Sequence, residues 1–138
     1  MRMFTLATYS RVINDGPDRD TRYRVLMHDL PRRFHRLARS DQAAALAEPP
    51  PLTGTRWDAL LAAVVEHVAW LHGHTIPAWV EEPARFLRRP WVISRNPVIA
   101  ADSVLYAPAA FIRHGALPDP LDLDARAGDE HEWVPGQR

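Results

Sequence analysis

The sequence predicts an all-α fold, a compact single domain of one long central helix plus several short helices that begin at proline. Residues 56–72 repeat apolar side chains at steps of three and four, which gives a helix one broad buried face. Downstream, prolines follow one another at intervals of six to eleven residues, at Pro77, Pro83, Pro90, Pro97 and Pro108. Because proline fits the first turn of a helix and not its interior, this spacing predicts a string of short helices.

The composition sets limits on the chemistry of the chain. Its 138 residues, 46% hydrophobic and 25% charged, are enough for one core without a disulfide or metal staple. The absence of cysteine excludes disulfides, thiolate zinc sites and a cysteine nucleophile. All 17 cationic side chains are arginine, which excludes Schiff-base and P-loop chemistry. No signal-peptide core and no apolar run of the ~20 residues that span a membrane is present, so we expect a cytoplasmic protein.

Residues 1–47 form the predicted N-terminal helical segment. In it, "MFTLATYSRVI" fits a helix or a strand, "NDGPDRD" fits a turn, and "TRYRVLMHDL" fits a helix. The stretch "PRRFHRLARSDQAAALAE" predicts a helix that restarts near Ser40 and ends before the prolines at 49–51. We expect an apolar edge formed by Leu30, Phe34 and Leu37. The opposite edge is expected to be basic, with Arg32, Arg36 and Arg39.

Residues 48–116 form the predicted core module, and its long helix runs from about Arg56 to His72. Thr55 and Asp58 have the spacing of a capping box with the shorter acid. Gly73 follows the helix at the position where a left-handed residue commonly ends one. Both ends of the helix therefore agree with its apolar periodicity.

The rest of the module is expected to form short helices near 77–81, 83–89, 97–105 and 108–114, the last closed by Gly115. The segment "RPWVIS" fits a short extended piece as well, because Val and Ile follow a proline. We expect seven apolar residues of this region in the core: Trp79, Phe86, Leu87, Trp91, Leu105, Phe111 and Ile112. Residues 117–138 are an acidic tail, of which at least 126–138 are expected to be mobile.

The segment "VVEHVAWLHGH" is the richest in potential metal ligands. His67 and His72 are five positions apart and point to different sides of a helix, and the helix ends before His74. In the zinc-protease motif the glutamate follows the first histidine, whereas Glu66 precedes it here. The pattern therefore predicts no metal site, with Glu66 in solvent, His72 beside the negative end of the helix, and His74 in a loop.

Two further candidates for catalysis are also weak. Glu81 and Glu82 are adjacent, so they do not share a face as a paired acid and base would, and we expect them to cap the helix that begins at Pro83. Ser94 lacks the glycine elbow of a serine nucleophile and has no identifiable base. The sequence thus predicts no enzyme, no catalytic residue and no cofactor.

The remaining candidates are arginines interleaved with aromatic residues, a mixture that suits an anionic partner. The candidate partner-binding residues are Arg32, Arg36, Arg39, Trp79, Arg85, Arg88, Arg89, Trp91 and Arg95. The alternative is structural, with the rings in the core and the arginines on a solvated face. An acidic protein and a nucleic acid both remain open as partners. Charge alternates along the chain in blocks that a compact fold would neutralise.

The core module resembles a family of actinobacterial proteins. The resemblance covers about residues 48–115 and rests on "RWDALLAAVVEH", "PAW", "EPARFLRRPW" and "APAAF" in this order. Many relatives look like helix-turn-helix regulators with this module at the C-terminus, and members often lie beside genes for nucleotidyltransferase-like proteins. The resemblance implies an antitoxin or regulatory partner that binds a cognate protein, such as a nucleotidyltransferase-like toxin.

The chain departs from this family at both ends. Residues 1–47 show no pair of amphipathic helices joined by a short glycine-containing turn, which argues against direct DNA binding. After Gly115 the sequence is acidic and rich in proline, where relatives are more apolar. We therefore expect an antitoxin-like protein-binding module, with a small nucleic-acid-binding regulator as the alternative.

Overall fold

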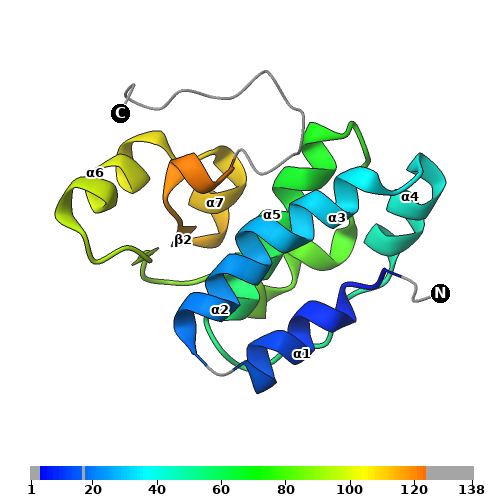
Figure 1. Ribbon diagram of the computed structural model, residues 1–138, viewed down its shortest axis with the longest axis horizontal. Coiled ribbons are helices and arrows are strands. Elements are labelled where there is room, and N and C mark those ends of the chain that lie inside the picture. The colour runs from blue at the N-terminus through cyan, green and yellow to red at the C-terminus, as the bar shows by residue number, and fades with distance from the viewer. Residues whose placement is uncertain (1–3, 17, 124–138) are drawn as a thin grey trace.

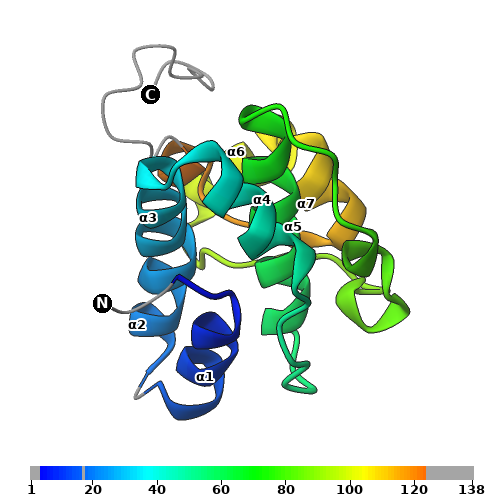
Figure 2. The same cartoon turned by 90° about the vertical axis from the view of Figure 1, so that its right-hand side faces the viewer.

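Helix α5 (Trp57–Leu71) supplies a large share of the core of this mostly helical chain (Figure 1). The computed structural model describes residues 4–16 and 18–123. In Figure 2, α5 lies between α3 on one side and α7 on the other. Of its 15 residues, 11 are buried, so the helix is covered on nearly all sides and not along one stripe. Its ends lie within one residue of the predicted ones.

The two ends of α5 compare differently with the prediction. Gly73 has a φ of 72°, and its N–H donates to the carbonyl of Trp70, so the left-handed ending is confirmed. The predicted capping box of Thr55 and Asp58 is wrong, because no side chain caps the first turn at Arg56. The Asp58 carboxylate instead accepts from the backbone N–H groups of Thr53 and Gly54 and from the Thr53 hydroxyl.

The regular elements described in the N-terminal part are all helices. Helix α1 (Ala7–Asp15) settles the choice between helix and strand. Next come α2 (Arg19–Arg24), a π-helical segment η1 (Val25–Asp29) and α3 (Leu30–Arg36), which form one continuous helical run longer than α5. The Tyr9 hydroxyl of α1 donates to Asp29, which ties α1 to this run.

The π segment has a physical cause in Pro31. Proline has no N–H to donate, and its ring would collide with the carbonyl four residues earlier in a regular helix. The N–H of Leu30 bonds to the carbonyl of Val25, five residues back, which widens the turn just before the proline. The sequence analysis predicted a helix here and did not anticipate the wider turn.

Helix α4 (Arg39–Ala47) restarts one residue before the predicted Ser40, after an extended backbone at Leu37 and Ala38. Arg39 thus belongs to a different helix from Arg32 and Arg36, and the predicted shared basic edge is wrong. The Arg39 guanidinium instead donates to the carbonyls of His72 and Gly73 at the end of α5, 2.8 and 3.1 Å away.

The C-terminal part consists of short elements. They are η2 (Ala78–Glu81), η3 (Pro83–Arg85), β1 (Trp91–Val92), α6 (Pro97–Tyr106), α7 (Ala109–His114), β2 (Ala116–Leu117) and η4 (Pro120–Leu123). The predicted helix over 83–89 is wrong beyond Arg85, and the extended alternative for "RPWVIS" is confirmed. The two strands pair in parallel, with Trp91 opposite Ala116 and Val92 opposite Leu117.

The predicted core of this part is correct for Trp79, Trp91 and Phe111, which are buried. It is wrong for Leu105 and Ile112, whose exposed fractions are 71% and 60%. Phe86 and Leu87 are half-buried. Within residues 4–16 and 18–123, no helix is long and apolar enough to cross a membrane. The predicted mobile residues 126–138 lie outside the described part of the chain.

Candidate partner-binding surface

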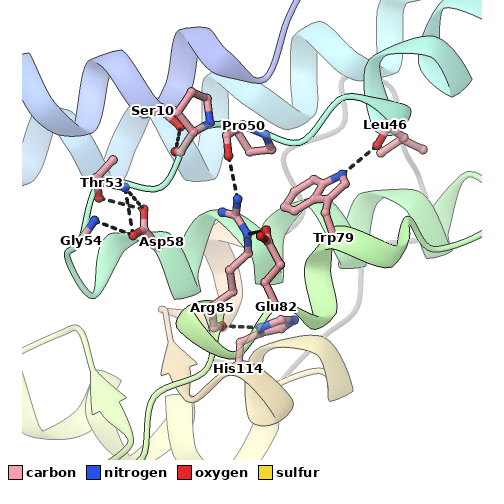
Figure 3. A network of polar contacts seen from close by, with 11 residues as sticks. Ser10, Leu46, Pro50, Thr53, Gly54, Asp58, Trp79, Glu82, Arg85 and His114 are labelled. Atoms are coloured by element: carbon pink, nitrogen blue, oxygen red, sulfur yellow. Dashed lines mark hydrogen bonds and ion pairs between the residues drawn. The ribbon is translucent and has the colours of Figure 1, made fainter.

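Arg85, one of the nine candidate residues, is an interior side chain with only 1% of its surface exposed. Its Nε donates to the Glu82 carboxylate at 2.8 Å, and its Nη2 donates to the Pro50 carbonyl at 2.6 Å (Figure 3). The guanidinium also lies 4.7 Å from the centre of the Trp79 ring. Arg85 therefore fastens the proline stretch at 49–51 to η3, and it does not face solvent.

The two candidate tryptophans are buried as well. The Trp79 indole N–H donates to the Leu46 carbonyl at 2.8 Å (Figure 3). The Trp91 ring meets Trp57 edge to face, with ring centres 4.9 Å apart. Neither ring is open to a partner, so the structural alternative is correct for these two aromatic residues.

Three other candidates remain on the surface around β1. Arg88 and Arg89 precede the strand, Arg95 follows it, and all three are exposed. The structure adds two arginines that sequence reasoning missed. The Arg56 guanidinium lies 4.1 Å from the centre of the Trp91 ring, and the Arg19 guanidinium donates to the Ile93 carbonyl. We call these five the basic surface: Arg19, Arg56, Arg88, Arg89 and Arg95.

The arginines of the basic surface form no ion pair in the described part of the chain. The ion pairs found among residues 4–16 and 18–123 involve other arginines and histidines, and none includes a member of this surface. Arg19 and Arg56 were missed because they reach β1 from distant parts of the sequence. Arg19 is 74 positions from Ile93, and no local sequence pattern predicts such a contact.

The other three candidates lie on different elements. Arg32 and Arg36 are exposed on α3, whereas Arg39 opens α4 and binds the carbonyls of His72 and Gly73, directly after α5. The structure therefore divides the nine candidates into a buried set, a surface set around β1 and a set on α3 and α4.

A pocket of about 330 Å³ adjoins the basic surface, because Arg19 and Arg95 belong to its wall. Its other lining residues are Asp20, Tyr23, Ile93, Ser94, Ile99, Asp119 and Asp122. The Asp122 carboxylate accepts from the Tyr23 hydroxyl at 2.7 Å and lies 3.1 Å from His28 Nε2. Burial first, and the nearby Asp122 carboxylate second, raise the pKa of Tyr23, which keeps its hydroxyl protonated.

Ser94 lies in this pocket without the surroundings of a nucleophile. Its hydroxyl oxygen accepts a hydrogen bond from the backbone N–H of Asn96, 3.2 Å away. The nearby histidine, His28, is engaged with Asp122. Among the described residues, the Ser94 hydroxyl thus has no hydrogen bond to a histidine or a carboxylate.

The predicted roles of the acidic residues on α5 and η2 are wrong. Glu66 is 13% exposed, not solvated, and it accepts from His114 at 2.8 Å and from Arg113 at 3.1 Å. Glu81 pairs with Arg113 and Glu82 with Arg85, and no side chain caps η3. Glu66 and Glu81 thus join α5 and η2 to Arg113 of α7, whereas the pair of Glu82 and Arg85 is local.

The histidines of "VVEHVAWLHGH" also have structural partners. The His72 ring packs edge-on against Phe34, and His74 Nε2 lies 2.8 Å from the Gln42 side-chain oxygen. His74 thus lies in a loop, as predicted, and its side chain also contacts Gln42 of α4. No group of three or more metal-ligating side chains occurs within residues 4–16 and 18–123.

The described part of the chain is mostly helical, and four of the five arginines of its basic surface, around a two-residue strand, are exposed. Comparison with protein-family models, with curated proteins and with solved structures gives no match. Support for a function therefore comes from the geometry of this chain.

Proposed function

We propose that the protein is a protein-binding regulatory module, an antitoxin-like partner that neutralises one cognate protein. The observation that carries the proposal is the basic surface, in which five arginines surround β1 without an intramolecular ion pair among the described residues. Arginine is enriched at the centres of protein interfaces, where its planar fork binds carboxylates through two parallel hydrogen bonds. An acidic face of the cognate protein is the complementary surface.

Two members of the basic surface are already held in place. Arg56 is stacked on Trp91, and Arg19 is hydrogen-bonded to Ile93. A guanidinium that stacks on a ring keeps its N–H donors at its edge, where a carboxylate can reach them. Because these side chains lose little freedom on binding, the entropic cost of forming an interface with them is reduced.

The same observations favour a protein over a nucleic acid as the partner. Phosphates would also bind arginines, but single-stranded nucleic acids additionally stack their bases on open aromatic faces. Trp91 is buried beneath Arg56, and Phe86 is stacked on His114 with ring centres 4.3 Å apart. The aromatic residues next to the basic surface are thus already covered. A nucleotidyltransferase-like toxin, as the family resemblance implies, is our specific proposal for the partner.

The test is a tagged pull-down from the native host, with and without nuclease, followed by mass spectrometry. We expect one stoichiometric protein that survives nuclease and is lost in the double variant Arg88→Glu/Arg89→Glu. The control is Arg32→Glu/Arg36→Glu, which reverses two other exposed charges, on α3, and should keep the partner. The proposal would be contradicted if nucleic acid were the main molecule bound, or if both variants lost the protein partner equally.

Co-expression of the captured protein then tests neutralisation. If that protein slows growth, the wild-type chain should restore growth and the Arg88→Glu/Arg89→Glu variant should not. A captured protein that is harmless when expressed alone would leave a binding module and remove the antitoxin role.

A further inference from the structure

The pocket beside the basic surface lies where three segments that are far apart in the sequence meet. Helix α2 forms one wall, residues 93–95 and the start of α6 form a second, and the chain around η4 forms a third. In Figure 1, the orange end of the described chain, η4, lies between α6 and the N-terminal helical run. At about 330 Å³ the pocket is at the small end of the range of ligand sites, which suits a small molecule.

Charges of both signs line this pocket. Its cationic residues are Arg19 and Arg95, and its acidic residues are Asp20, Asp119 and Asp122. The side chains of Arg95 and Asp20 are both exposed, and within residues 4–16 and 18–123 they form no ion pair with each other or with any other residue. The pocket therefore offers a ligand one cation and one anion that the described fold does not pair.

The arginine side of the pocket has the donors that a carboxylate needs. The Arg19 guanidinium donates to the Ile93 carbonyl, which holds it in place and leaves others of its five N–H groups for a ligand. The Ser94 hydroxyl accepts from the backbone N–H of Asn96 and keeps its own hydrogen for donation. Arg95 adds a planar fork, which binds carboxylates through two parallel hydrogen bonds.

The acidic side of the pocket is fixed by hydrogen bonds between distant segments. The Tyr23 hydroxyl donates to Asp122 Oδ2 at 2.7 Å and accepts from the backbone N–H of Asp119 at 3.1 Å. His28 Nε2 lies 3.1 Å from the other oxygen of Asp122, Oδ1. His28 belongs to the π segment η1, and π turns inside helices frequently occur at functional sites. The Asp122 carboxylate is thus held in the pocket wall by partners from α2 and η1.

We infer that the pocket binds a small zwitterion, an aliphatic α-amino acid, with its carboxylate at Arg19 and Arg95 and its ammonium group at the aspartates. A phosphate ester would bring two negative charges to three carboxylates, and a simple amine would leave both arginines without a partner. A zwitterion matches both signs at once. Ile93 and Ile99, which also line the pocket, provide apolar surface for the aliphatic side chain.

Binding of an amino acid does not depend on the proposed function, although Arg19 and Arg95 also belong to the basic surface. The other two arginines beside β1, Arg88 and Arg89, do not line the pocket. The double variant Arg88→Glu/Arg89→Glu, which should lose the protein partner, should therefore still bind the amino acid. Failure of the pull-down and failure of amino-acid binding are thus separate results.

Titration of the isotope-labelled protein, followed by NMR, provides the first test. The probes are L-valine, L-leucine and L-isoleucine. At least one should shift the amide signals of residues 19–23 and 93–95, with a dissociation constant between about 10 µM and about 1 mM. The best binder is then compared with the same molecule without its amino group and without its carboxylate, which for L-leucine are 4-methylpentanoate and 3-methylbutylamine. Each should bind at least about tenfold more weakly, because one charged side of the pocket stays unpaired.

Two pairs of matched variants test the residues. Arg95→Gln should raise the dissociation constant about tenfold or more, whereas Arg89→Gln, the same change at an exposed arginine outside the pocket, should not. Asp20→Asn should weaken binding in the same way. Its control is Asp41→Asn, because both aspartates are exposed and lie in the first turn of a helix. All four changes are on the surface, so the variants should fold.

Three results would overturn the inference. The first is that none of the three amino acids binds with a dissociation constant below about 1 mM. The second is that the acid or the amine alone binds as tightly as the whole amino acid. The third is that the control variants lose binding as much as Arg95→Gln and Asp20→Asn do.

Discussion

His114 Nε2 lies 2.8 Å from Glu66 Oε1, so that a fully buried side chain of α7 is joined to the largely buried carboxylate of α5. The other ring nitrogen, Nδ1, lies 2.7 Å from the carbonyl oxygen of Arg85 (Figure 3). The ring also stacks on Phe86. One imidazole thus connects α7, α5 and η3 through both of its nitrogens and one of its faces.

The replacement His114→Ala should destabilise the protein by about 3 kcal/mol, because it leaves a cavity and removes both hydrogen bonds. Arg113→Ala is the matched control, since the partly exposed Arg113 shares Glu66 and should cost less than about 1 kcal/mol. Urea denaturation of the two variants measures the difference. Equal losses would show that His114 is not the connecting residue.

Replacement of Arg85 should reduce stability much more than replacement of Arg88, although the two residues are only three positions apart. Arg85→Ala removes packing on Trp79 and leaves the Pro50 carbonyl unpaired, so we expect a loss of about 2–4 kcal/mol. Arg88→Ala changes an exposed side chain and should alter stability by less than about 0.5 kcal/mol. Thermal or urea unfolding tests this contrast, and a neutral Arg85→Ala would return Arg85 to the candidate binding residues.

Stability should fall in alkali because of Tyr23. Its pKa is raised in the folded state, so the stabilisation is fully present below the unfolded value of about 10 and is lost as the pH rises above it. Tyr23→Phe removes the titrating group and should flatten the decline of the free energy of unfolding between pH ~9 and ~11. Urea midpoints across this range provide the measurement, and parallel curves for both proteins would refute the assignment.

Two glycines have nearly equal positive φ values but different surroundings. Their replacement by alanine therefore distinguishes the cost of the backbone conformation from the cost of a steric clash. Gly54 has a φ of 78° with nothing within 4 Å of an added Cβ, whereas at Gly115, with a φ of 81°, a Cβ would lie 3.1 Å from the Leu87 carbonyl oxygen. Gly54→Ala should cost about 1–2 kcal/mol from the left-handed conformation alone. Gly115→Ala should cost at least about 1 kcal/mol more, because Leu87 must move. Urea unfolding that ranks Gly54→Ala as the more harmful change would contradict a steric role for Leu87.

The parts of the fold that depend on local signals were predictable from the sequence. The periodicity of α5, the prolines that open η3 and α6, and the left-handed glycines 73 and 115 are all properties of a few neighbouring residues. The π segment was not predictable, because "TRYRVLMHDL" has an ordinary helical pattern and the disturbance comes from the proline that follows it.

The candidate site was less predictable, because burial of a charged side chain is decided by distant segments. Nothing near Arg85 indicates that the carbonyl of Pro50, 35 positions earlier, will receive its guanidinium. Helix α6 shows the same limit for apolar residues. Its sequence is apolar on most sides, so periodicity does not tell which side faces the core, and Leu105 was placed there wrongly.

Arg39 couples the local unfolding of α5 to that of α4. The last turn of a helix ordinarily frays on its own, because its carbonyls lack partners within the helix. Directly after α5, the carbonyls of His72 and Gly73 are bound by the first residue of α4, more than 30 positions earlier, which holds the end of the helix in place. Amide protons in that turn should therefore exchange with solvent only when α4 leaves its place, so that the two helices gain and lose protection at the same rate.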